Sequence, residues 1–495
     1  MPAAASVPDL ILRAARDPAL RGRVALATAT QRVTYRELES RITCIAAALQ
    51  ADRLARGERV GLLAGRSADA AAGLLGIMAA GGVACVLDTR AAPADLALRT
   101  RRAGIARLLV DDAHVLLAEK INVNKINKLC KLQAASAATV ADLAATDDAL
   151  LLFTSGSSGK PKAVLLSHGN LLANAQGVIE RTGITPDDRL LHAMPLHHTN
   201  GINNQLIAPL ACGATVILLE RFRAETFFEE AARHRPTYIT GVPTMFARLL
   251  EQVPPAGALR DLRFARCGSA PLAADLHRKI ENHLGVALVV SYGLSEATCT
   301  SAMNPPAARR IGSVGTALAG QDIAIFAPQT EQALACGAEG EICIAGPALM
   351  KGYVTAGDGD GDDGPRLRNG WLRTGDLGRI DADGYLSISG RLKDIIIRGG
   401  ENLSPAAIET ALLMHPAVKY CCVVGAPHTD LGEVPAAFVV LHADQAAVQD
   451  GLKGLVAEQL SRAHVPHHII FMDALPEIGI GKIDRGALKV QAGRL

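Results

Sequence analysis

The pattern of apolar and polar positions divides the chain into short strand-like runs and longer helix-like segments. From about residue 20 to residue 350, runs rich in β-branched and aliphatic residues are each followed by turn residues and then by a helical pattern. This alternation is typical of layered α/β domains. The clearest strands are expected at residues 59–63, 107–110, 214–219, 238–240 and 287–290.

The pattern changes after residue 340. Residues 340–389 are rich in glycine and aspartate, and short strands are expected there at 341–344 and 385–388. Several short strands between turn residues indicate a small β-rich subdomain.

From residue 391 the chain has the pattern of a further unit, with about a hundred residues, enough for a small independent core. Its strands are expected at residues 418–424 and 436–441, and a helix at 447–460. We therefore expect an α/β protein with two domains. Residues 1–390 would form a large domain of layered α/β subdomains plus the β-rich subdomain, and residues 391–495 a small, mobile α+β domain.

One apolar segment resembles a membrane span, because residues 70–87 contain no charged side chain. The pair Gly81-Gly82 divides this segment into a helix-like half and a strand-like half. A buried helix–turn–strand unit of an α/β domain has the same pattern. We therefore expect no membrane span.

Composition and charge exclude several classes of protein. The formal charge is +2, from 51 basic and 49 acidic residues, and no basic stripe indicates a nucleic-acid partner. Ten cysteines are scattered without a C-x-x-C pair, which is typical of reduced thiols buried in a cytoplasmic protein. The first residues lack the basic and apolar regions of a signal peptide, so a cytoplasmic location is expected.

Two unusual segments receive no functional assignment. Residues 120–131 hold four lysines and are expected to be a surface insertion. Residues 358–363 begin like a calcium-binding loop, but Asn369 stands where such a loop needs a glutamate. We expect a solvated acidic loop.

A run of small and hydroxylated residues carries the strongest chemical signal. It follows the apolar strand 151–153 and consists of Thr154, Ser155, Gly156, Ser157, Ser158, Gly159 and Lys160. Glycines at two positions allow backbone N–H groups to point at one anion, while the hydroxyls and the lysine add donors and charge. The run predicts a phosphate-binding loop, although it lacks the Walker spacing. A flexible linker is the alternative, but apolar strands on both sides disfavour it.

This loop resembles the phosphate-binding loop of the adenylate-forming superfamily, which contains acyl- and aryl-CoA synthetases, beetle luciferases and adenylation domains of nonribosomal peptide synthetases. Further motifs follow in the family's order and cover the chain from about residue 20 to residue 490. The resemblance implies that the protein binds ATP and Mg²⁺ and forms an acyl-adenylate.

The segment 291–297 resembles the family's second motif. The resemblance implies that Tyr292 stacks on adenine, that Ser295 meets the phosphates and that Glu296 holds Mg²⁺ and acts in catalysis. A hard carboxylate suits a hard cation. The remaining residues that the resemblance assigns to the nucleotide site are Ser291 and Gly293 of this motif and Gly268, Ser269, Ala270 and Pro271 upstream.

Three later positions resemble family residues that act at the domain junction. Asp376 matches the aspartate that accepts hydrogen bonds from the ribose hydroxyls, and Arg391 matches an arginine that contacts ribose and phosphate. Lys393 takes the hinge position between the two domains. Taken alone, Asp376 would be an ordinary turn residue.

Lys482 follows Leu475-Pro476 near the end of the chain. The resemblance makes it the catalytic lysine of the C-terminal domain, which acts as a lid. An ammonium there can offset charge as a carboxylate attacks the α-phosphate. Without that context it would be a surface lysine.

The acid site is expected near residues 194–201. His198 takes the place of the family's catalytic histidine, and His197 replaces the usual aromatic residue. With His192 nearby a metal site is conceivable, but the spacing shows no ligand geometry. An aspartate that would hold an α-amine is absent, and Ser291 stands where malonate-type enzymes carry arginine. The expected substrate is a monocarboxylic acid, fatty or aryl.

The predicted function is ATP-dependent activation of this acid, followed by transfer of the acyl group to a thiol, with CoA as the acceptor. One alternative is a ligase that loads an acyl-carrier protein, since that arm ends in the same thiol. A second is a catalytically silent nucleotide-binding protein on the same fold.

Overall fold

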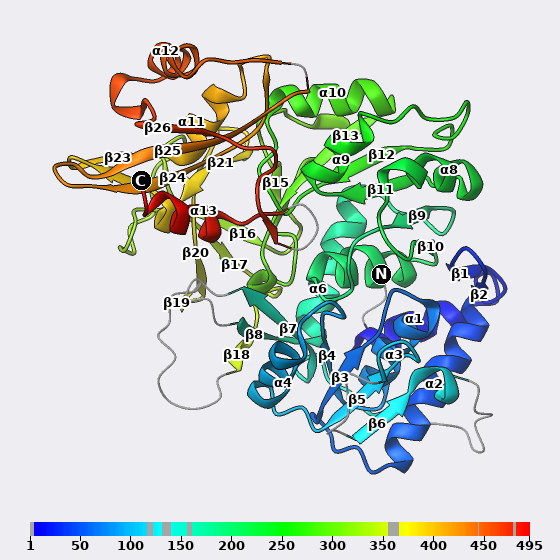
Figure 1. Ribbon diagram of the computed structural model, residues 1–495. Helices are drawn as coiled ribbons and strands as arrows, with labels where there is room; N and C mark the ends of the chain where they lie inside the picture. Colours follow the sequence, from blue (N-terminus) through cyan, green and yellow to red (C-terminus); the bar gives the residue numbers. More distant parts are fainter. Residues whose placement is uncertain are drawn as a thin grey trace.

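The computed structural model describes residues 4–115, 122–130, 140–155, 161–354, 366–443, 445–478 and 482–495 (Figure 1). Within these residues the protein is a mixed α/β structure with several sheets, as the sequence predicts. The strands expected from the sequence are all present, with ends that differ from the predicted ones by a few residues.

The first sheet lies in the middle of the molecule and is mainly parallel. Its strands are β1 (Val24–Ala27), β2 (Arg32–Thr34), β9 (Arg189–His192), β10 (Thr215–Leu218), β11 (Tyr238–Gly241), β12 (Phe264–Cys267), β13 (Ala287–Tyr292), β14 (Ala302–Met303) and β15 (Thr316–Ala317). Among the described residues their order is β15-β14-β13-β12-β11-β9-β10-β1-β2. The strands from β1 to β13 in this order pair in parallel, and the two edges are antiparallel.

The second sheet is built from the N-terminal part of the chain. Its strands are β3 (Arg59–Leu63), β4 (Val83–Val86), β5 (Arg107–Val110), β6 (Asn122–Lys125), β7 (Asp148–Ser155), β8 (Pro161–Ser167) and β18 (Gly352–Val354). In the described part of the chain their order is β18-β8-β7-β4-β3-β5-β6. Strands β7 to β6 are parallel, whereas β8 is antiparallel to both β7 and β18.

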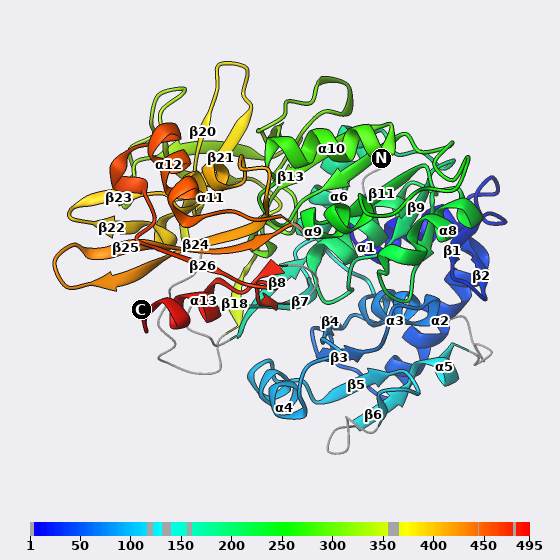
Figure 2. The ribbon, with the colours of Figure 1, turned by 45° about the horizontal axis from the view of Figure 1, so that its top comes forward.

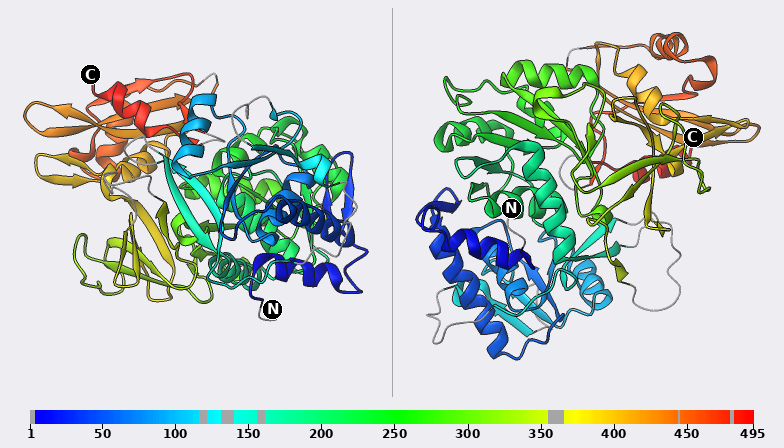
Figure 3. Two further views of the ribbon diagram at one scale, coloured as in Figure 1. Left: turned by 90° about the horizontal axis from the view of Figure 1, so that it is seen from below. Right: turned by 180° about the vertical axis from the view of Figure 1, so that it is seen from behind.

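Helices fill the space between these two sheets and cover their outer faces (Figures 1 and 3). The inner layer contains α1 (Val7–Arg16), α2 (Tyr35–Ala51), α3 (Ala68–Ala79), α5 (Ile126–Leu129), α6 (His168–Thr182), the π-helix η2 (Asn200–Ile207) and α7 (Ala208–Ala211). Helices α8 (Ala224–His234), α9 (Pro243–Leu249) and α10 (Ala274–Leu284) cover the first sheet, and α4 (Pro93–Arg102) covers the second. Apolar faces on both sides of a parallel sheet require such layers.

The uncharged segment 70–87 forms most of α3, a turn and β4, all of them buried. The expected helix–turn–strand unit is therefore confirmed. No helix among the described residues is long and apolar enough to cross a bilayer.

The lysine-rich segment departs from the expectation of a surface insertion. Residues 122–129 form β6 and α5, and β6 pairs with β5 at the edge of the second sheet. The side chain of Ile126 is 1% exposed and belongs to the core between the sheets. That expectation was wrong for this part, because apolar residues among the lysines let the segment pack. The acidic residues 358–363 lie outside the described residues.

The β-rich subdomain expected after residue 340 is an antiparallel sheet. Its strands are β16 (Asp322–Phe326), β17 (Gly340–Ala345), β19 (Arg366–Arg368), β20 (Trp371–Ile380) and β21 (Leu386–Arg391). Three short 3₁₀ turns, η3 (Ser295–Ala297), η4 (Pro306–Ala308) and η5 (Leu392–Asp394), lie before and after it in the chain.

A fourth sheet belongs to the C-terminal part (Figure 2). It consists of β22 (Ile396–Arg398), β23 (Glu401–Leu403), β24 (Val418–His428), β25 (Gly432–Leu441) and β26 (His468–Phe471). Helices α11 (Pro405–Leu412) and α12 (Gln449–Gln459) pack on one face and α13 (Arg485–Ala492) on the other, with η6 (Arg462–His464) and the hairpin β27 (Glu477–Ile478)–β28 (Lys482–Ile483) nearby in sequence.

All ten cysteines lie within the described residues and none forms a disulfide. Six are buried, as expected, but Cys336 is exposed.

Candidate active site

Three of the predicted nucleotide-site residues meet at one carboxylate. Tyr292 ends β13, Asp376 lies in β20 and Arg391 ends β21. The Tyr292 hydroxyl donates to Asp376 Oδ2 at 2.7 Å, and Arg391 Nε lies 2.7 Å from Asp376 Oδ1. Asp376 and Arg391 are cross-strand partners in the antiparallel sheet, which brings their side chains together.

Burial and charge shift the titration of this group. Burial, followed by the charge of Asp376, raises the pKa of Tyr292 well above its ordinary value, so the phenol stays protonated and donates. The negative charge of Asp376 raises the pKa of Arg391. An ionised carboxylate has about four lone-pair sites, so Asp376 can accept further donors besides these two.

Glu296 lies in η3 and is only 6% exposed. Its Oε1 accepts a hydrogen bond from the Tyr353 hydroxyl at 2.8 Å, and the Tyr353 ring lies 5.0 Å from Lys162 Nζ. Burial raises the pKa of Glu296, while the hydrogen bond from Tyr353 and the positive charges of Lys162 and Arg391 act in the opposite direction. A buried carboxylate with this environment fits a hard divalent cation, whose charge would favour the ionised form.

The predicted phosphate loop connects two antiparallel strands. Thr154 and Ser155 end β7 opposite Lys162 and Pro161 of β8, so the two ends of the loop are held side by side. The loop residues Gly156, Ser157, Ser158, Gly159 and Lys160 lie outside the described residues. Strand β18 pairs with β8 and carries Tyr353, which links the base of the loop to Glu296.

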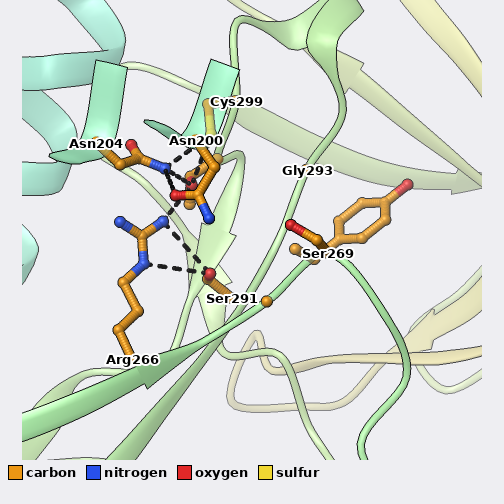
Figure 4. Close-up of a pocket in the computed structure, with 10 residues that line it drawn as sticks. Asn200, Asn204, Arg266, Ser269, Ser291, Gly293 and Cys299 are labelled. Atoms are coloured by element: carbon orange, nitrogen blue, oxygen red, sulfur yellow. Dashed lines mark hydrogen bonds between the residues drawn. The ribbon is translucent and has the colours of Figure 1, made fainter. Parts of the chain in front are cut away.

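A pocket beside Tyr292 contains about 220 Å³ of empty space, part of it open to solvent (Figure 4). Apart from two glycines, the ring of Tyr292 and the thiol of Cys299, the residues that line it have polar side chains. The lining residues are Asn200, Asn204, Arg266, Gly268, Ser269, Ser291, Tyr292, Gly293, Cys299 and Thr300.

The two motifs predicted to form the adenine slot therefore meet at this pocket. A Cβ atom on Gly268 would lie 2.9 Å from Ser291 Oγ and 3.2 Å from Ser291 O, so glycine at this position lets the two segments approach closely. Ser269 has a φ of 69°, a strained conformation for a residue other than glycine. Of the other predicted slot residues, Ala270, Pro271 and Ser295 do not line the pocket.

The sequence interpretation missed Arg266 and Asn204, and it gave Asn200 no role of its own within the predicted acid region 194–201. Arg266 lies in the buried strand β12, where a charged residue within an apolar run is a detectable signal. Asn200 and Asn204 lie four residues apart on the π-helix, a rare form that often occurs at functional sites. Their side chains are hydrogen-bonded to each other, Nδ2 of Asn204 donating to Oδ1 of Asn200 at 3.1 Å.

The three histidines of the predicted acid site are not grouped around one point. Burial lowers the pKa of His192 to about 3, and its Nε2 lies 2.8 Å from the Gly201 carbonyl. His197 pairs with Asp88 at 3.5 Å, while His198 is exposed and its ring centroid lies 4.4 Å from that of His197. None of them lines the pocket, and the described residues contain no metal-binding cluster.

The last two predicted residues belong to the C-terminal part. Lys393 is exposed in η5, two residues after Arg391. Lys482 begins β28 and its backbone pairs with Ile478, but its side chain lies outside the part of the chain that the structure describes.

Comparison with known proteins places this arrangement in a family. Residues 13–354 match the family described as AMP-binding enzyme, and residues 407–482 match the AMP-binding enzyme C-terminal domain. The first match covers more than half of the chain.

Similar curated proteins are CoA ligases for different acids. A sulfoacetate–CoA ligase from Cupriavidus necator is 39% identical over 339 residues, which cover 68% of this chain and 66% of that protein. A feruloyl-CoA synthase from Amycolatopsis sp is 33% identical over 471 residues, covering 93% and 94%.

Solved structures agree with this grouping. ATP-bound MatB from Rhodopseudomonas palustris superimposes with a TM-score of 0.91 at 31% identity, covering 98% of this chain and 99% of that one. The o-succinylbenzoate CoA synthetase of Bacillus subtilis, solved with ATP and a magnesium ion, gives 0.84 at 30% identity over 97% and 99%. The chain belongs to the AMP-binding enzyme family, in its branch of AMP-forming acid–CoA ligases.

Proposed function

We propose that this enzyme joins a short, polar carboxylic acid to CoA through an acyl-adenylate formed at the pocket beside Tyr292. The observation that carries the proposal is the contact between the Tyr292–Asp376–Arg391 group and a small pocket lined by polar side chains. The Tyr292–Asp376–Arg391 group suits a nucleoside, and the pocket suits an acid.

At the nucleotide end, the ring of Tyr292 offers a face for adenine. Asp376 accepts the ribose hydroxyls, and Arg391 contacts ribose and phosphate. The hydroxyls and backbone of residues 154–160, together with Lys160, hold the phosphates. The location of the loop ends on paired strands next to Tyr353 and Glu296 supports this assignment.

Glu296 is the candidate ligand for Mg²⁺, because it is a buried carboxylate that Tyr353 of β18 links to the strands at the base of the phosphate loop. A magnesium ion bound there would offset negative charge on the phosphates. The Tyr353 hydroxyl orients the carboxylate by donating to its Oε1.

The acid occupies the part of the pocket lined by Asn200, Asn204 and Arg266, and adenine lies against the ring of Tyr292. Part of the pocket's empty space of about 220 Å³ is open to solvent, so the enclosed room for the acid is small. Together with the polar lining, this size favours a short, polar acid over the fatty or aryl acid expected from the sequence. The similar CoA ligases are named for both short and aromatic acids, so they do not decide between these classes.

The reaction has two steps. A carboxylate oxygen of the acid attacks the α-phosphorus of ATP, the bond to pyrophosphate breaks, and pyrophosphate leaves. The thiol of CoA then loses its proton and attacks the acyl carbon, and AMP leaves with the electrons of the broken carbon–oxygen bond. Residues 1–390 bind ATP and acid, while residues 391–495 pivot about Lys393 and bring Lys482 to the α-phosphate for the first step only.

The test is AMP formation with a broad panel of acids, Mg·ATP and either CoA or a phosphopantetheinylated carrier protein as acceptor. Acid-dependent AMP and acyl-CoA formation are expected. Transfer to the carrier protein alone would favour a carrier-protein ligase. If no acid in the panel yields AMP, the protein is a silent nucleotide-binding member of the family.

A further inference from the structure

Arg266 is a buried cation in the wall of the acid pocket. It lies in β12 between β11 and β13 and is only 5% exposed. Its Nε donates to Ser291 Oγ at 3.3 Å, and its Nη2 donates to Thr300 Oγ1 and, at 3.4 Å, to Ser291 Oγ (Figure 4). These contacts fix the guanidinium plane at the pocket surface.

Nothing in the described chain neutralises this charge. No carboxylate of the described residues forms an ion pair with Arg266, and among those residues its Nη1 makes no hydrogen bond. Burial lowers the pKa of Arg266, because the charged guanidinium loses hydration there. Buried charges in proteins are normally paired or hydrogen-bonded to strong acceptors.

Other poorly exposed arginines in the chain have stronger acceptors. Arg373 pairs with the carboxylate of Glu341, and Arg181 and Arg66 donate to main-chain carbonyls. Within the part of the chain that the structure describes, Arg266 has only the neutral hydroxyls of Ser291 and Thr300 as acceptors. It therefore has the donor capacity to take an anionic group from the pocket, since a guanidinium carries five N–H donors in a rigid fork.

We propose that Arg266 binds a second anionic group of the acid, so that the substrate is a short dianion with a sulfonate, phosphonate or second carboxylate near its reacting carboxylate. This inference rests on the proposed function and names the substrate class of the same site. It also accounts for the serine at position 291. The cation that binds the second anion comes from the neighbouring strand, and Ser291 orients it.

The first test compares acids that have nearly the same shape but differ by one charge. Suitable pairs are malonate and malonamate, succinate and succinamate, and sulfoacetate and methylsulfonylacetate. With the wild-type enzyme, kcat/KM for AMP formation should be at least about 100-fold higher for the dianion of a pair, because a site built for a hydrogen-bonded group rejects analogues that lack it. The pair whose dianion gives the highest kcat/KM identifies the anionic group. Equal use of both members in every pair would overturn the inference while leaving the ligase function intact.

The second test uses Arg266→Gln and Arg266→Lys. In Arg266→Gln, kcat/KM should fall about 100-fold or more for the dianion but less than about threefold for its neutral-ended partner. The loss for the dianion in Arg266→Lys should lie between these values. If Arg266 had a purely structural role, the substitution would lower kcat/KM for both acids equally. Arg263→Gln is the matched control, since Arg263 lies next to the same strand, pairs with Asp188 and does not line the pocket.

If no acid yields AMP, the proposed function fails, and thermal-shift titrations decide the inference separately. The inference would be supported if the dianion stabilised the wild-type protein, its neutral-ended partner did not, and Arg266→Gln abolished the stabilisation. Equal stabilisation by both, or none by either, would overturn it. Should Arg266→Gln fail to fold, the wild-type pairs and Arg266→Lys still give the answer.

Discussion

The Tyr292 hydroxyl donates a hydrogen bond of 2.7 Å to Asp376, which lies 84 residues further along the chain. Tyr292 belongs to the nine-stranded sheet and Asp376 to the β-rich sheet. This contact therefore joins two sheets at the proposed nucleotide site, and both residues are buried there.

Tyr292→Phe keeps the ring and removes this donor. We expect KM for ATP to rise roughly tenfold, because a hydrogen bond to a charged group contributes about 1.5–3 kcal/mol. Pyrophosphate exchange at varied ATP concentration measures the change. Tyr385→Phe is the control, since its hydroxyl bonds the Ala308 carbonyl away from the pocket. If both variants raise KM equally, the hydroxyl of Tyr292 has no special role in nucleotide binding.

Glu296→Gln removes the proposed metal ligand. Activity at limiting Mg²⁺ should fall by more than about 10- to 100-fold, the loss caused by residues that only support a ligand.

Burial raises the pKa of Glu296, so its contribution to stability is present at low pH and is lost as the pH rises through that raised value. Without Mg²⁺ the variant should therefore be the more stable protein at alkaline pH, and this advantage should shrink on acidification. Urea unfolding across this range measures it. Wild-type Mg²⁺ dependence in the variant would contradict the assignment.

Lys482→Ala should separate the two half-reactions. Acid-dependent pyrophosphate exchange should fall by about 100-fold or more, because the charge at the α-phosphate is lost, while thiolysis of supplied acyl-adenylate continues. Lys489→Ala, in the exposed helix α13, is the matched control. Equal loss of both half-reactions in Lys482→Ala would exclude the proposed role.

Acid should destabilise the protein partly through His168. Burial lowers its pKa from 6.5 to about 4, and its Nδ1 accepts a hydrogen bond from the backbone N–H of Val7 in α1. The stability that neutral His168 provides is present above about pH 6.5 and is lost as the pH falls towards 4, in total roughly 3 kcal/mol. His168→Gln should flatten the pH dependence of urea unfolding in this window. The exposed His442, replaced in the same way, is the control, and an unchanged slope in His168→Gln would refute the prediction.

Two exposed ion pairs join the C-terminal part to the segment around α9. Arg248 lies 3.0 Å from Glu477, and Lys419 lies 2.8 Å from Glu251. Removing both pairs with Glu251→Gln and Glu477→Gln should cost less than about 1 kcal/mol each in unfolding free energy. It should also speed tryptic cleavage at exposed Lys393 about two- to fivefold, because the C-terminal part is held less firmly. Glu230→Gln, which breaks a pair within α8, should leave cleavage unchanged.

Much of the fold followed from the sequence because local patterns determine it. The run at 59–63 is β3, and the uncharged segment 70–87 is α3 and β4. Apolar runs bounded by glycines and charged residues determine such elements locally, so distant residues are not needed to predict them. The lysine-rich segment was misjudged, because its packing depends on Ile126 reaching a core formed by other parts of the chain.

The site was only partly predictable. Motif residues such as Tyr292 and Asp376 could be named, but their contact depends on how two sheets dock. Arg266 was missed because its importance comes from neighbours on other elements, Ser291 on β13 and Thr300 in the segment between η3 and β14. Such convergence of separate segments is a property of tertiary structure, and no local sequence pattern predicts it.

The cross-strand pairing of Asp376 with Arg391 has a thermodynamic consequence. Arg391 is the last residue of β21, and β22 of the C-terminal sheet begins at Ile396. In the proposed function, a pivot at Lys393 would therefore act on the chain directly beside the ribose-binding carboxylate. Linkage is reciprocal: if one orientation of the C-terminal domain strengthens the binding of a nucleotide, that nucleotide stabilises the same orientation by an equal free energy. ATP, acyl-adenylate and AMP would then each set their own balance between orientations, and the order of the two reaction steps would follow from the nucleotide bound.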